Sequence, residues 1–250
     1  MIKWPSSAAL TSISDAAPLT DRLSGIDEYL KLFTPDQFEH VSAGDIEIWQ
    51  TNWKLAIENA VESYHLFKVH ERTLEQISPT RGAYYVAGSS EWSITGGSTG
   101  RKKDIVNEAF GGSQDELYEH YLLVALAPSF VGVLTYGSFG WLSAHPLGSG
   151  VTQIRSGATM MSSEGLGGGA NGREFTQAFF AEDQMICERV YTGMESRISS
   201  GGKLVDMERV VVDFHQYWGG RLGQLPPTER FDDEMAQPWL QVAGMVGDSR

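Results

Sequence analysis

Residues 53–70, WKLAIENAVESYHLFKVH, repeat apolar and polar positions with the period of an α-helix. One stripe is apolar and predicts a face packed on a core: Ile57, Ala60, Val61 and Tyr64. A second stripe recurs at i, i+4 and i+7 and is polar: Glu58, Glu62 and His65. His70 follows His65 by five positions. The pattern predicts a helix with one face in the core and a second face that meets either water or a metal.

Three stretches of the chain predict strands. Residues 44–53, GDIEIWQTNW, alternate in polarity, and residues 83–96 suggest one or two further strands. Residues 117–160 are rich in β-branched and aromatic residues punctuated by Gly and Pro, which predicts an antiparallel meander of three or four strands. Strands flanked by a few long helices indicate the α+β class.

The remaining segments predict helices and loops. Residues 15–33 predict a loop and a short helix, and residues 174–194 and 204–222 predict two longer helices. Loops are expected at 96–116 and 162–172, where Gly and Ser gather. We expect a single domain over 1–250, divided as follows: a lead-in at 1–40, a core at 41–225 and a tail at 226–250.

Asp183 stands out on the helix predicted at 174–194. On a wheel of about 100° per residue, six apolar residues fall within about 60° of it. They are Phe179, Phe180, Ile186, Cys187, Val190 and Met194. Glu182 lies off this stripe. A lone buried carboxylate is costly, so Asp183 must be paired with an Arg or Lys, protonated or bound to a metal.

Composition and charge narrow the classes of partner. The 250 residues are 41% hydrophobic and 11% aromatic, as in a globular chain, and the formal net charge is −13. An acidic surface argues against nucleic acid and anionic membranes as partners. We expect no membrane span and no signal peptide. Cys187 is the single cysteine, which fits a reducing cytoplasm and excludes any site that needs two cysteine ligands from this chain.

His65, His70 and Asp183 together suggest a metal site. On an ideal helix, residues five apart point about 140° from each other, so the two histidines converge only if the helix ends or distorts between them. Taken singly, either histidine would be read as an ordinary core or surface residue. Two imidazoles and one carboxylate, however, suit a facial triad that holds Fe(II) and leaves open positions.

The stretch NWKLAIENAVESYHLFKVH resembles the signature of the catalytic domain of Rieske non-heme iron oxygenase α subunits. The matching positions are Asn52, Trp53, Lys54, Glu58, Asn59, Glu62, His65 and His70. The later AEDQMICERVYTG resembles the family segment whose Asp, here Asp183, is the third iron ligand. The resemblance covers roughly residues 15–220. It implies a helix-grip fold, in which a curved antiparallel sheet wraps around a long helix with a substrate cavity between them.

The resemblance also implies roles for residues around the metal. His65, His70 and Asp183 would hold mononuclear Fe(II), Asn59 would lie near it, and Glu62 would stand where the family has an acid that links the iron to a neighbouring cluster. Trp53 and Tyr64 are expected to pack. Candidates for the pocket wall, half of them facing outward, lie on the meander: Phe130, Leu134, Tyr136, Phe139 and Trp141. His145 is expected at the surface.

The expected activity is O2-dependent hydroxylation, dihydroxylation or demethylation of a small hydrophobic or aromatic substrate. Family members carry an N-terminal Rieske domain with a [2Fe–2S] cluster on two Cys and two His. This chain, with one Cys, cannot hold that cluster. We expect either a split system fed by a separate Rieske protein and its reductase, a truncated gene, or a domain that has lost activity. A homotrimer, weak in the isolated chain, is also expected.

Two other classes stay open at this stage. One is a hydrolase that binds Zn2+ with the same three residues and activates a water. The other is a carrier that binds a hydrophobic ligand without chemistry, since one fold can host several functions. Metal content separates them: iron favours the oxygenase, zinc the hydrolase, and no metal the carrier.

Overall fold

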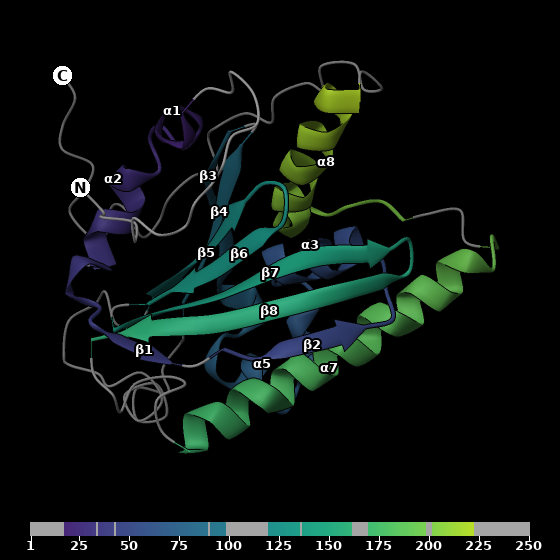
Figure 1. Ribbon diagram of the computed structural model, residues 1–250, viewed down its shortest axis with the longest axis horizontal. Helices are drawn as coiled ribbons and strands as arrows, with labels where there is room; N and C mark the ends of the chain where they lie inside the picture. The colour runs from purple at the N-terminus through teal and green to yellow at the C-terminus, as the bar shows by residue number, and fades with distance from the viewer. Residues whose placement is uncertain are drawn as a thin grey trace.

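An open, antiparallel, eight-stranded sheet lies at the centre of the computed structural model (Figure 1). The strand order is β1-β8-β7-β6-β5-β4-β3, and β2 also pairs with β8. The structure describes residues 18–33, 35–42, 44–89, 91–98, 120–135, 137–161, 170–198 and 202–222. None of the helices in these ranges combines the length and apolar character needed to cross a bilayer.

The strands confirm the predicted meander and add one strand at the edge. Their bounds are β1 His40–Ser42, β2 Ile46–Trp49, β3 Ala83–Gly88, β4 Trp92–Ser98, β5 His120–Leu126, β6 Phe130–Leu134, β7 Ser138–Gly148 and β8 Val151–Met160. The stretch 117–160 therefore holds four strands, and 83–96 begins two. Strand β1 was not predicted, because its three residues are too short to show a period.

Helices occur in all the predicted segments, with a break around residue 62, and the short helices η2, α5 and η3 were not predicted. Their bounds are α1 Leu19–Arg22, α2 Asp27–Leu30, η1 Lys31–Phe33, η2 Pro35–Gln37, α3 Trp53–Val61, α4 Leu66–Val69, α5 Leu74–Ile77, η3 Thr80–Gly82, α7 Ala170–Glu195, η5 Asp206–Glu208 and α8 Arg209–Leu222. The two long helices expected at 174–194 and 204–222 are present with shifted ends. The single helix predicted over 53–70 is wrong.

Glu62 explains why that helix is interrupted. Helix α3 begins after Asn52, whose side chain accepts a hydrogen bond from Lys54 N at 3.0 Å. After Val61 the backbone becomes extended, and the Glu62 carboxylate accepts hydrogen bonds from the backbone N–H groups of Tyr64 and His65. These N–H groups would otherwise continue the helical ladder. The apolar stripe thus ends at Val61, and Tyr64, expected to pack, is 39% exposed.

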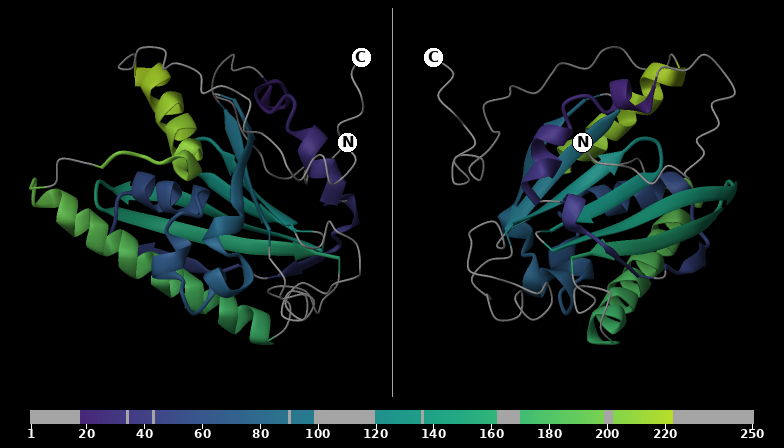
Figure 2. Two further views of the ribbon diagram at one scale, coloured as in Figure 1. Left: turned by 180° about the vertical axis from the view of Figure 1, so that it is seen from behind. Right: turned by 60° about the vertical axis from the view of Figure 1, so that its left-hand side comes forward.

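The two faces of the sheet bury different segments. Helices α3 to α5 lie over one face (Figure 2, left). There a core cluster includes Ile57 and Val61 of α3 with Leu123 of β5. Trp53 packs at its margin against Trp218 of α8, with ring centroids 5.1 Å apart, as expected. A second cluster joins other residues of the strands to the segment that contains α2 and η1.

The lead-in segment is part of the packed structure. Ile26, Leu30 and Phe33 are buried against a cluster that includes Leu122 and Val124 of β5. Side chains alternate between the faces of a strand, so Leu123 faces α3 while its neighbours face the lead-in. The proposed division at residue 40 stays a prediction. The expected tail 226–250 and the first 17 residues lie outside the described ranges, as do residues 99–119 and 162–169, which hold most of the two predicted loops.

Helix α7 runs along the edge of the sheet formed by β2 (Figure 1). Gln184 Nε2 donates to Ile48 O at 3.3 Å, and Thr51 Oγ1 donates to Cys187 O at 3.1 Å. These bonds turn the middle of the predicted apolar stripe inward, so that Phe180 and Cys187 are buried on either side of Asp183. The last members of the stripe, Val190 and Met194, are 43% and 55% exposed, so the stripe is buried only through Cys187.

Candidate metal centre

His65 and His70 stand at the two ends of the one-turn helix α4. His65 is its N-cap residue and His70 its C-cap residue. The ring centroids lie 5.1 Å apart. The helix thus ends at His70, whose φ of −107° and ψ of 31° lie outside the helical region, and this ending permits a convergence that a continuous helix would prevent.

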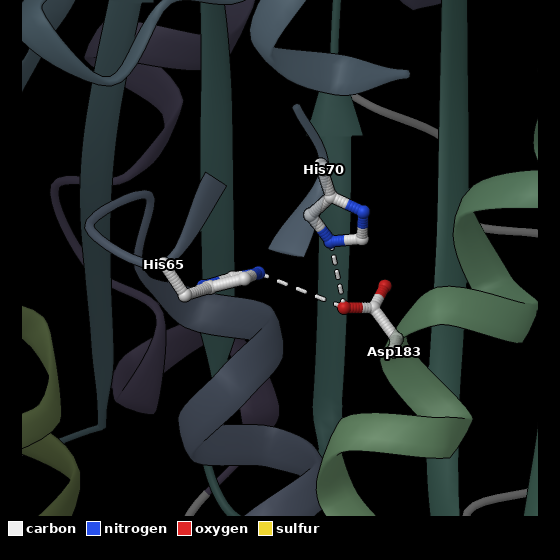
Figure 3. Close-up of side chains that lie close together, drawn as sticks. All are labelled: His65, His70 and Asp183. Atoms are coloured by element: carbon white, nitrogen blue, oxygen red, sulfur yellow. Dashed lines mark hydrogen bonds and ion pairs between the residues drawn. The ribbon is translucent and has the colours of Figure 1, made fainter. Parts of the chain in front are cut away.

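Asp183 completes a group of three possible ligand atoms. Its Oδ1 atom lies 2.9 Å from His70 Nε2 and 3.6 Å from His65 Nε2, and Figure 3 shows both rings directed at the carboxylate. The three donor atoms all lie within 4.8 Å of one another. Ligands about 2.1 Å from a metal and at right angles to one another are about 3 Å apart, so the spacing fits one face of an octahedral ion. The expected Asn59 is also here, with Nδ2 donating to Asp183 Oδ1 at 2.7 Å.

The other nitrogen of each imidazole is held by a glutamate. His65 Nδ1 pairs with Glu62 Oε1, and His70 Nδ1 lies 2.7 Å from Glu182 Oε2. Thr73 Oγ1 donates to the same Glu182 oxygen at 2.5 Å. A carboxylate at Nδ1 keeps the proton there and turns the Nε2 lone pair toward the shared centre. This is the arrangement that a metal ligand needs.

Sequence reasoning missed the roles of Glu182 and Thr73. Glu182 lies off the apolar stripe of α7, and this position predicts no part for its side chain in the metal site. That interpretation is wrong, because the Glu182 side chain holds His70. The sequence did contain a signal for Glu182, because it directly precedes Asp183. Side chains at adjacent helix positions can reach opposite edges of one imidazole ring, here that of His70. Glu58, by contrast, pairs with His215 Nε2 of α8 at 2.9 Å and does not join the group.

The electrostatics of the group follow from burial and from the close acids. His70 is fully buried, while the side chains of His65 and Asp183 are 17% and 16% exposed. Burial opposes protonation of His65, but its hydrogen bonds to Asp183 and Glu62 raise its pKa to about 9. Burial likewise opposes ionisation of Asp183, but the bonds from His65 and His70 lower its pKa.

The partners of Asp183 decide between the readings of its buried charge. Among the described residues, they are the two histidines and Asn59 rather than an arginine or a lysine. A donor set of two imidazole nitrogens and one carboxylate oxygen, each oriented by a further hydrogen bond, fits a divalent transition metal. The residues present therefore fit mononuclear Fe(II), and they fit Zn2+ by the same criterion.

A cavity of about 240 Å³ opens beside the three residues. Its walls are mainly apolar and come from α3 to α5, from strands β5 to β8 and from the first half of α7. Of the five predicted wall residues, Trp141 lines it, and Tyr136 lies outside the described part of the chain. Leu134 and Phe139 belong to the second cluster, on the other face of the sheet, and neither these two nor Phe130 lines the cavity. The half-buried His145 does not line it either.

Comparison with known families gives one match over most of the chain. The family described as "Ring hydroxylating alpha subunit (catalytic domain)" matches residues 35–224. No curated protein matches the sequence significantly.

Solved structures with the same fold include three oxygenases. A quaternary ammonium Rieske monooxygenase, described in connection with carnitine oxidation by gut microbiota, superposes with a TM-score of 0.66 at 17% identity, over 84% of this chain and 57% of that one. Naphthalene 1,2-dioxygenase from Rhodococcus sp. gives 0.59 at 16% identity, over 85% and 63%. Dicamba monooxygenase bound to dicamba gives 0.50 at 12%, over 73% and 59%. The chain thus spans less than two thirds of each structure, and at these identities the likeness establishes the fold.

Proposed function

The chain belongs to the ring-hydroxylating alpha subunit family through its catalytic domain, and on that basis we propose that it is the catalytic component of a non-heme iron oxygenase. Family membership confirms the resemblance drawn from residues 53–70, and the sheet with its long helix is the fold of the oxygenases described above. We propose O2-dependent hydroxylation, dihydroxylation or demethylation of a small hydrophobic or aromatic molecule.

The observation that carries this proposal is the position of Asp183 Oδ1 against both histidine Nε2 atoms beside an apolar cavity. His65, His70 and Asp183 would hold Fe(II), and bound Fe(II) would supply the activation of O2. Glu62 and Glu182 would fix the two imidazoles, and Asn59 would fix the carboxylate. The apolar walls would hold the substrate and limit access of water to the site.

Electrons would come from a Rieske [2Fe–2S] cluster outside these 250 residues. A Rieske cluster needs two cysteine ligands, and this chain has one cysteine. Glu62 would be the acid that connects such a cluster to His65. In support, Glu62 contacts His65 at Nδ1, the ring nitrogen that faces away from Asp183. A role confined to orienting His65 rests on the same contact, so the two roles need an experiment to separate them.

Metal content is the first test. We expect about one iron per chain after anaerobic purification with added Fe(II), measured by elemental analysis. Preferential retention of zinc would favour the hydrolase, and no retained metal would favour a carrier. Family membership favours iron.

Turnover is the second test. The iron-loaded chain with NADH and O2 alone is expected to oxidise no added substrate. A Rieske protein and its reductase should restore O2 consumption coupled to product. Full NADH-driven turnover by the chain alone would overturn the proposed source of electrons.

A further inference from the structure

A group of hydroxyl side chains lines one wall of the otherwise mainly apolar cavity. Three belong to the sheet or follow one of its strands: Tyr121, Thr135 and Ser138. They stand next to Leu122, Leu134 and Phe139, which are register partners across β5, β6 and β7. The other two, Ser63 and Ser78, contact the Tyr121 hydroxyl. All five residues are buried, with exposed fractions between 3% and 9%. Several buried hydroxyls grouped on one wall provide a polar end to the cavity.

Tyr121 contacts both Ser63 and Ser78 on this wall, and its hydroxyl has an incompletely used donor. Ser78 Oγ donates to Tyr121 Oη at 2.7 Å, so this bond uses the oxygen and leaves the Tyr121 proton free. The remaining recorded contact is with Ser63 Oγ at 3.4 Å, which is long for an O–H···O bond. Tyr121 can therefore donate to an acceptor in the cavity without losing a strong bond.

The position of the Tyr121 ring requires a glycine at the paired position of the next strand. Tyr121 pairs with Gly97 across strands β4 and β5, and its ring lies over that glycine. A Cβ atom at position 97 would lie 2.1 Å from Tyr121 Oη, so any other residue would push the hydroxyl aside. The absence of a side chain at position 97 thus provides the space that this hydroxyl occupies.

The charges near Tyr121 favour an uncharged acceptor. Burial raises the pKa of Tyr121, and the negative charge of Glu75 raises it further, so the hydroxyl stays protonated. The same negative charge disfavours an anion at this wall. Among the described residues that line the cavity, Arg173 is the one Lys or Arg; its side chain is 56% exposed and bonded to Asp45 at 3.0 Å.

We infer that the substrate class is a small, neutral, mainly hydrophobic molecule with one hydrogen-bond acceptor, such as a ketone oxygen, which the Tyr121 hydroxyl holds. A volume of about 240 Å³ is below the range of roughly 300–1,000 Å³ typical of drug-sized ligand sites, so one or two rings fit best. A tetraalkylammonium ion offers no acceptor, and a carboxylate would meet the negative charge. That this ligand is a substrate rests on the proposed function. Its binding to Tyr121 does not require the metal.

Binding of a matched ligand pair tests the inference. Indane and 1-indanone share one bicyclic frame and differ at the ketone, so the ratio of their dissociation constants isolates the acceptor. Titration calorimetry on the metal-free 250-residue chain would compare wild type with Tyr121→Phe. We expect the substitution to shift the ratio by roughly 3- to 10-fold against 1-indanone, the effect of one hydrogen bond. Tyr64→Phe, at an exposed tyrosine away from the cavity, is the matched control and should leave the ratio unchanged.

A spectroscopic measurement on wild type keeps the test independent of variant folding. The carbonyl stretch of bound 1-indanone should lie below its value in an apolar solvent, because a donated hydrogen bond weakens the C=O bond. An unshifted stretch, an unchanged ratio in folded Tyr121→Phe, or tighter binding of indane-1-carboxylate than of 1-indanone would overturn the inference. Repeating the titrations with Fe(II) under anaerobic conditions separates the two proposals. Tyr121-dependent binding without iron retention would refute the oxygenase alone, and iron retention without Tyr121 dependence would refute this inference alone.

Discussion

His70 Nδ1 lies 2.7 Å from Glu182 Oε2, while His70 Nε2 lies 2.9 Å from Oδ1 of the next residue, Asp183. Two consecutive acids of α7 therefore hold opposite edges of one buried imidazole. Successive helix positions point about 100° apart, which lets both side chains reach around the ring. Under the proposed function, Asp183 would be a ligand and Glu182 a positioning residue.

Replacing Glu182 with Ala is expected to weaken iron binding. The variant removes the acceptor at His70 Nδ1, so the ring and its proton lose their fixed orientation, and losses of roughly 10- to 100-fold in metal affinity are typical of such contacts. Competition titrations with a chelator under anaerobic conditions would measure the change. Glu174→Ala is the control, because Glu174 is exposed on the same helix and away from the cavity. Equal affinities of the two variants would contradict the positioning role.

Asp183→Ala should abolish iron retention and leave the metal-free fold largely intact. The substitution removes a candidate ligand atom together with the acceptor of Asn59 Nδ2. It also leaves the buried His70 Nε2 without its acceptor, so the unfolding midpoint should fall while the circular dichroism spectrum of the folded variant stays unchanged. Elemental analysis and circular dichroism would measure the two effects, with Glu174→Ala as the control. Full iron occupancy in folded Asp183→Ala would show that the ligand assignment is wrong.

Glu62→Gln separates electron transfer from support of His65. The amide oxygen can replace Oε2 and still accept the backbone N–H groups of Tyr64 and His65, but the amide NH2 cannot accept from His65 Nδ1, so iron binding should weaken and still reach full occupancy at saturating Fe(II). If Glu62 links the iron to the external cluster, reoxidation of the reduced Rieske protein by the iron-loaded chain and O2 should slow strongly. A peroxide-driven reaction, which bypasses the link, should suffer less. Stopped-flow absorbance and peroxide consumption would follow the two reactions, and equal losses in both would assign Glu62 to support of the metal site alone.

Gly140 is expected to set the size of ligand that the cavity accepts. It lies on β7 opposite Val133 and Ala158, it lines the cavity, and an added Cβ atom there would meet nothing within 4 Å. Gly140→Leu should therefore fill the cavity without strain and weaken binding of 1-indanone at least about 10-fold at little cost in stability. Gly148→Leu is the matched control, because Gly148 has equally open space on the same strand but does not line the cavity. Similar ligand affinities in both variants would contradict the assignment.

The sequence predicted the sheet and the metal-site residues better than it predicted the cavity. Four strands of the meander and the approach of His65, His70 and Asp183 follow from polarity patterns and from the resemblance. The break after Val61 was missed, because it depends on a side chain, Glu62, that bonds to backbone two and three residues ahead. Three of the five predicted wall residues do not line the cavity, because the alternation of a strand fixes which residues share a face but not which face is inward.

Asp213 gives a prediction about stability that is independent of the metal. Burial raises its pKa to about 6, although the hydrogen bond from Tyr85 and the charge of Arg209 act against the increase. A carboxyl whose folded pKa exceeds its unfolded value of 3.8 binds a proton more tightly in the native state, so stability falls as pH rises through the interval between the two values.

The variant Asp213→Asn tests this effect. Relative to wild type, its free energy of unfolding should increase by about 1–3 kcal/mol as pH rises from 4 to 7, and the difference should stay constant above pH 7. The amide oxygen can still accept the Tyr85 hydroxyl, which donates to Asp213 Oδ2 at 2.9 Å. Urea unfolding of both proteins at pH 5 and pH 8 would measure the difference, with exposed Asp206→Asn as the control. A difference between Asp213→Asn and wild type that is the same at both pH values would show that the carboxyl is not destabilised by its burial.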